Sequence, residues 1–82
     1  MKKFLFSFEA IEGTYTYCIE ETCIERARKA AKWFYGEPLE IHEASDTEVE
    51  KWSSGLCEFE REVQANLNSA MDFVRYMENE EE

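Results

Sequence analysis

Few side chains in this sequence have the chemistry of a metal site. Three cysteines and a single histidine, the residue types that bind structural zinc, occur as Cys18, Cys23, His42 and Cys57. Their successive separations of five, nineteen and fifteen residues match no common zinc-binding motif. We therefore expect no metal and no cofactor. Cys23 and Cys57 are instead expected to be buried as small apolar side chains, and Cys18 to lie on the outer face of a hairpin.

Catalysis by a nucleophile or a general base would have to use His42, because it is the only histidine of the chain. No motif orients it toward Cys57, with which it could form a thiolate pair. Neighbouring carboxylates are expected by chance where acids are so numerous, and a domain of 82 residues leaves little room for a ligand pocket. The sequence therefore favours a protein that is not an enzyme.

Acidic side chains outnumber basic ones by 19 to 9, which gives a net charge of −10. Residues 1–36 hold six basic and five acidic residues (+1), whereas residues 37–82 hold three basic and fourteen acidic residues (−11). This charge argues against direct binding of nucleic acid and against docking on an anionic membrane. It favours a partner-binding surface made of carboxylates in the second half of the chain: Glu40, Glu43, Asp46, Glu48, Glu50, Glu58, Glu62 and Asp72.

A second candidate contact combines cations with an aromatic side chain. On a helical wheel of residues 22–35, Trp33 falls between Arg26 and Lys29. An aromatic ring among cations is typical of protein contact sites. The alternative is that the acidic second half folds over this helix and pairs its cations internally.

The elements that must position these residues begin with a β-hairpin over 3–21. Apolar and polar side chains alternate on both sides of Glu12-Gly13, which is expected to form a two-residue turn. The pairs expected across this turn are Ala10 with Tyr15, Phe8 with Tyr17, and Phe6 with Ile19.

Helices and a third strand are expected after the hairpin. Capping-box patterns that begin at Thr22 and Ser45 predict one helix to about Tyr35, ended by Gly36, and a short helix through Trp52, with a short strand over 39–42 between them. From residue 56 to about 79 no Gly or Pro occurs, and apolar residues recur every three or four positions: Leu56, Phe59, Val63, Leu67, Ala70, Val74 and Met77. A strand over 56–64 is the alternative, but the Glu, Gln and Ala content favours helix.

The fold class is therefore α+β, with a β-hairpin, a helix, a short third strand, a short helix, and a long C-terminal helix packed on a small antiparallel sheet. We expect a single domain over 1–82 whose acidic tail, 78–82, frays. Glu9 interrupts the first apolar run too early for a signal peptide, and no stretch has the roughly 20 apolar residues of a membrane span. The odd number of cysteines adds to a prediction of a reduced, cytoplasmic setting.

In organisation the whole chain resembles the small acidic single-domain inhibitors encoded by bacteriophages, of the anti-CRISPR and anti-restriction kind. The resemblance rests on the strand that opens at Met1-Lys2-Lys3, on the hairpin 3–21 followed by the helix Thr22–Tyr35, and on the carboxylates of 37–82. It implies a protein partner, such as a CRISPR effector complex in a bacterial host cell, that is blocked at its nucleic-acid-binding or nuclease surface. The cations of the helix depart from a pure DNA mimic.

The function expected from the sequence is a non-enzymatic acidic protein that binds and inhibits a nucleic-acid-handling protein, by mimicking or blocking nucleic-acid binding. The partner would offer a basic nucleic-acid-binding surface. The alternative is a small protein-interaction or homodimerisation module built on the C-terminal helix, so the chain is expected to be a monomer or a homodimer.

Overall fold

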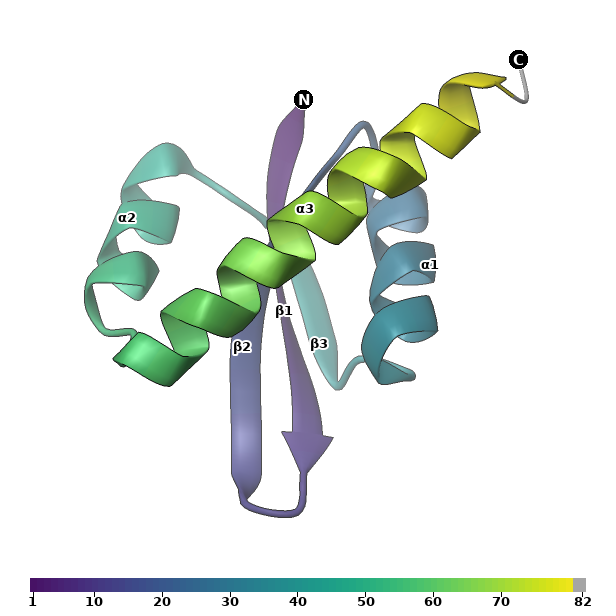
Figure 1. Ribbon diagram of the computed structural model, residues 1–82. Coiled ribbons are helices and arrows are strands. Elements are labelled where there is room, and N and C mark those ends of the chain that lie inside the picture. Colours follow the sequence, from purple (N-terminus) through teal and green to yellow (C-terminus); the bar gives the residue numbers. More distant parts are fainter. Residues whose placement is uncertain (81–82) are drawn as a thin grey trace.

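The computed structural model describes residues 1–80 and has the expected α+β architecture (Figure 1). Its three strands form one antiparallel sheet in the order β2-β1-β3: β1 (Lys2–Ala10), β2 (Gly13–Glu21) and β3 (Glu40–Ala44). The helices are α1 (Ile24–Tyr35), α2 (Asp46–Ser54) and α3 (Glu58–Glu80). The chain is thus helical from Glu58, and the strand alternative for 56–64 is wrong. No helix in the described part of the chain is both long enough and apolar enough to cross a membrane.

The hairpin forms, but its predicted register is wrong by two residues. Ala10 pairs with Gly13, so the turn lies at Ile11-Glu12, and Gly13 opens β2 with a φ of +139° that other residues rarely adopt. A shift of two keeps every side chain on its face, so the alternation of apolar residues cannot distinguish the two registers. The observed register gains cross-strand pairs of opposite charge and of aromatic rings: Lys2 with Glu21, Lys3 with Glu20, Phe8 with Tyr15, and Phe6 with Tyr17.

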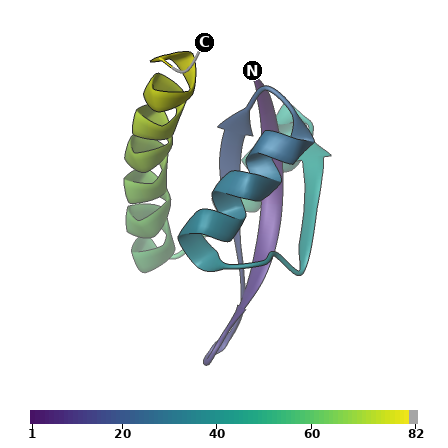
Figure 2. The same ribbon diagram turned by 90° about the vertical axis from the view of Figure 1, so that its right-hand side faces the viewer.

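One face of the sheet carries the main core, and both α1 and α3 cover it (Figure 2). The strands contribute four buried side chains, which are Phe4, Phe6, Tyr17 and Ile19. From α1 the core receives only small side chains, those of Ala27, Ala30 and Ala31. Small residues let the helix approach the aromatic face closely. Ile24, at the first position of α1, is 37% exposed.

The other face of the sheet holds a smaller cluster. Leu5, Cys18 and Ala44 are buried there, and Val49 and Trp52 of α2 pack against them. Cys18 therefore does lie on the face opposite the main core, but α2 covers it and only 8% of it is exposed. The other two cysteines reverse the prediction, because Cys23 is partly buried and Cys57 is exposed.

Two capping patterns had predicted helix starts, and one of them is confirmed. Ser45 is the N-cap of α2, and its hydroxyl accepts a hydrogen bond from the Glu48 amide at 3.2 Å. The box at Thr22 is wrong. Cys23 is the N-cap of α1 with no side-chain bond, because the buried Glu21 carboxylate accepts the Thr22 amide instead, at 2.8 Å.

The long helix α3 crosses the sheet obliquely (Figure 1) and is rotated from its predicted seam. Phe59 and Met77 of that seam are 65% and 45% exposed, whereas Gln64 and Met71 are buried beside Leu67. Two Gln64 hydrogen bonds to the β2 backbone turn this polar position inward. The fraying expected over 78–82 stays a prediction. Glu78 is helical and partly buried, and residues 81–82 lie outside the described part of the chain.

Candidate functional site

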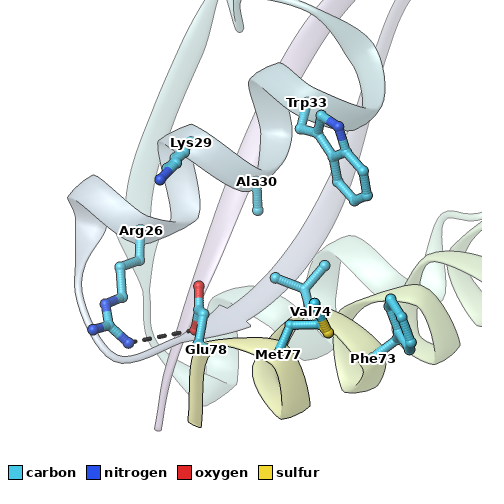
Figure 3. Close-up of a pocket in the computed structure, with 8 residues that line it drawn as sticks. All are labelled: Arg26, Lys29, Ala30, Trp33, Phe73, Val74, Met77 and Glu78. Carbon is cyan, nitrogen blue, oxygen red and sulfur yellow. Dashed lines mark hydrogen bonds and ion pairs between the residues drawn. The ribbon is translucent and has the colours of Figure 1, made fainter. Parts of the chain in front are cut away.

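A groove between α1 and α3 is the most distinctive surface feature of the molecule. On α1 its wall consists of residues at helical spacing, because positions 26, 29, 30 and 33 form one stripe: Arg26, Lys29, Ala30 and Trp33. The wall on α3 is also built of residues at helical spacing, which are Phe73, Val74, Met77 and Glu78. Figure 3 shows the two rows facing each other, with Trp33 and Phe73 at one end and Arg26 and Glu78 at the other.

The groove encloses about 400 Å³ and is apolar over most of its length. Three large apolar side chains line it although they stand largely in solvent: Trp33 is 70% exposed, Phe73 is 61% exposed and Met77 is 45% exposed. Clusters of large apolar groups left in water are typical of interaction sites on small folded domains. The lining contains no serine, threonine, cysteine or histidine, and its ionisable side chains are those of Arg26, Lys29 and Glu78.

One end of the groove is charged. The Arg26 guanidinium lies 3.4 Å from the Glu78 carboxylate. Burial raises the pKa of the Glu78 carboxyl and the neighbouring Glu21 carboxyl raises it further, whereas Arg26 and Lys29 act in the opposite direction. Glu21 is fully buried, and its second oxygen has no hydrogen-bond partner among the described residues. An acid of the second half thus pairs with Arg26, as the alternative expected, while Trp33 stays exposed and its role as a partner contact stays a prediction.

The acidic residues predicted as a partner surface separate into two sets. In the first set, around β3 and the start of α2, each carboxylate has a basic neighbour. Glu43 lies 3.5 Å from Lys2 and Asp46 lies 3.4 Å from Lys3. Glu40 and Glu48 flank His42, at 3.9 Å and 2.6 Å from its ring nitrogens. These contacts reduce the charge that this edge of the sheet offers to a partner.

The second set lies at the end of α2 and the start of α3. Glu50, Glu58 and Glu62 have no ion-pair partner within residues 1–80, and all three are exposed. Asp72, farther along α3, is bound by Arg75. The unpaired carboxylates of the predicted partner surface thus lie on α2 and at the start of α3, on either side of the loop that joins the two helices.

No group of three or more metal-ligating side chains comes together among the side chains that the structure describes. Two of the four cysteine and histidine residues make other contacts: the Cys57 thiol donates a hydrogen bond to Glu60 at 3.1 Å, and His42 contacts Glu48. Burial raises the pKa of the Cys18 thiol to about 11.

The three thiols are expected to react with an alkylating reagent at very different rates at pH 8. Cys57 reacts first because it is exposed, Cys23 follows, and Cys18 reacts only on unfolding because it is buried and stays protonated. Peptide mapping by mass spectrometry after timed alkylation measures the order. Modification of Cys18 as fast as Cys57 would show that α2 does not cover the second face of the sheet.

Half of the groove follows from the sequence and half does not. Arg26, Lys29 and Trp33 are among the predicted contact residues, whereas Phe73, Met77 and Glu78 are not. Phe73 follows Asp72 outside the predicted seam, and a large apolar residue at such a position is the signal that indicates an exposed apolar contact.

Comparison with protein-family models, with curated proteins and with solved structures finds no match to this chain.

Proposed function

We propose that this chain is a non-enzymatic protein-binding module and that the groove between α1 and α3 is its contact site. The observation that carries the proposal is the exposure of Trp33, Phe73 and Met77 around one groove of about 400 Å³. Aromatic residues and methionine are enriched at protein interfaces, where they supply much of the contact energy. Burial of these three side chains by a partner would remove apolar surface that the fold itself leaves in water.

The test compares three versions of the chain. Replacement of Trp33 and Phe73 together by serine is expected to weaken partner binding at least about 30-fold, because truncation of such interface residues costs 2 kcal/mol or more. Phe59→Ser is the matched control: Phe59 is 65% exposed on the same helix but lies outside the groove. Proteins captured by the original chain from a bacterial lysate, then purified, supply the partner for titration. If the double variant is folded and binds as tightly as Phe59→Ser, the groove is not the contact site.

A second candidate is the inhibitor expected from the sequence, which would occupy a basic nucleic-acid-binding surface, as in a CRISPR effector complex. It is favoured by one observation, the unpaired carboxylates Glu50, Glu58 and Glu62 near the α2–α3 loop. Unpaired charges that share one region attract a surface of opposite sign and speed its association.

Charge reversal tests this candidate. Glu58→Lys with Glu62→Lys is expected to slow association with a basic partner about tenfold or more, and to weaken the salt dependence of binding. Glu9→Lys with Glu25→Lys changes the net charge equally at distant sites on β1 and α1, so it separates location from total charge. Stopped-flow association at several salt concentrations measures both pairs of substitutions. Equal effects of the two pairs on the association rate would show that the acidic surface is not a specific binding site.

A further inference from the structure

Positive charge in this acidic protein is concentrated on α1, the helix that forms one wall of the groove. Four basic residues and one acid lie between Ile24 and Tyr35, a net charge of +3 in a chain of −10. Two of these cations have carboxylate partners within the molecule, since Arg26 contacts Glu78 and Lys32 lies 3.7 Å from Glu37. Lys29, between them on the groove rim, has no ion pair with any described residue.

The groove therefore presents an apolar floor beside an unpaired cation. Ala30 and Val74 are small and leave depth, while Trp33, Phe73 and Met77 stand up on either side. Glu78 is the nearest carboxylate of the groove, but it pairs with Arg26 and acts on Lys29 without an ion pair, so a further carboxylate beside Lys29 would complement its charge. A partner that fits both features carries apolar side chains and a carboxylate on one face.

The walls also restrict the backbone conformation of the occupant. Both are built of side chains from helices, and helix backbones have no free donors or acceptors to offer along their length. An extended peptide would leave its own amides unpaired against apolar groups, at considerable cost. A helix satisfies its amides internally. The stripe from Arg26 to Trp33 spans two helical turns, about 10 Å, and matches two turns of a partner helix.

We propose that the occupant of the groove is an amphipathic helix of a partner protein. This inference rests on the function proposed for the groove. This helix places two apolar side chains one turn apart between Trp33 and the Phe73–Met77 wall, and a carboxylate next to Lys29. A second copy of the chain fits less well, because two molecules of charge −10 repel each other.

The test needs no known partner. A displayed library of helical peptides, randomised over the exposed positions of two successive turns, is selected against the original chain and against Lys29→Glu. The original chain is expected to enrich apolar residues at i and i+4 with Asp or Glu one turn away. Selection against Lys29→Glu is expected to replace that acid by Lys or Arg, and peptides selected on the original chain should bind this variant at least about tenfold more weakly. Arg28→Glu is the matched control, with the same charge change on the same helix outside the groove lining.

The remaining outcomes separate the two proposals. Peptides that depend on Phe73 but are indifferent to Lys29→Glu would overturn the acidic helix and leave the groove as the contact site. Peptides that bind Phe73→Ser as well as the original chain would overturn both. A dimer seen by light scattering at high salt and abolished by Phe73→Ser would assign the groove to a second copy. Failure to enrich any helical peptide would likewise overturn the proposed occupant.

Discussion

Replacing Gln64 with leucine is expected to lower the free energy of unfolding by about 2–4 kcal/mol, because two buried backbone groups lose their partners at once. The Gln64 side chain accepts a hydrogen bond from the Cys18 amide at 2.9 Å and donates one to the Cys18 carbonyl at 2.8 Å. It also donates to Asn68 at 2.9 Å, and only 9% of the residue is exposed. Leucine fills a similar space but can make none of these bonds.

Urea unfolding followed by tryptophan fluorescence measures this effect. Asn66→Leu makes a comparable polar-to-apolar change at an exposed site on the same helix and is expected to change stability by no more than about 0.5 kcal/mol. The slope of the unfolding free energy against urea should stay constant if only stability changes. A loss of less than about 0.5 kcal/mol for Gln64→Leu would mean that water replaces the amide without penalty.

The Gln64 bonds belong to a row of side chains that covers the outer edge of β2. Trp52 donates to the Thr16 carbonyl at 3.0 Å, and Arg75 donates to the Glu20 carbonyl at 2.9 Å. With the bonds of Gln64 to Cys18, these contacts bind every second residue of β2, at positions 16, 18 and 20. The backbone groups of these residues face away from β1. An uncovered edge would be a template for pairing with other chains. Helices α2 and α3 thus protect β2 through polar side chains rather than through a further strand.

These edge contacts could not be predicted from the sequence, because each joins residues 36 to 55 positions apart. Predictions that depend on local signals succeed more often. The N-cap at Ser45 and the end of α1 at Gly36, which has a φ of +88°, follow from the chemistry of a few adjacent residues. The hairpin register fails although it is local, because two registers satisfy the same alternation.

The same distinction explains the candidate site. Arg26, Lys29 and Trp33 could be assigned to one exposed face because α1 has a clear apolar stripe on the other. The face of α3 could not, because Gln64 is polar and buried while Phe73 is apolar and exposed. Both residues depart from the rule that apolar side chains are buried and polar ones exposed, and in both cases the cause is a contact distant in sequence. Gln64 hydrogen-bonds to the backbone of β2, and Phe73 lines the groove opposite α1.

Met71→Ala is expected to lower the free energy of unfolding by about 2–5 kcal/mol, the usual cost of emptying a fully buried methionine site. Met71 is 1% exposed, and Leu67 at 3% is the only other buried apolar residue that the described part of α3 contributes to the core. The helix therefore has few fully buried apolar anchors, and loss of one leaves Leu67, the partly buried Val63 and Val74, and the polar contacts to hold it.

Met77→Ala is the matched control, because it removes the same atoms from the same helix at a position that is 45% exposed. Its expected cost in the free energy of unfolding is below about 1 kcal/mol.

The two variants should also differ in function. Met77→Ala removes part of the groove wall from a folded protein and weakens partner binding at every temperature below its unfolding transition. Met71→Ala should weaken binding only as α3 loosens, so its defect should grow with temperature. Calorimetric titration at two temperatures measures partner binding, and urea unfolding measures the free energy of unfolding of each variant. Equal losses of stability in the two variants would show that Met71 does not anchor α3. If the two variants differ in this way, the packing of α3 on the sheet depends on Met71, whereas the surface that α3 offers to a partner depends on Met77.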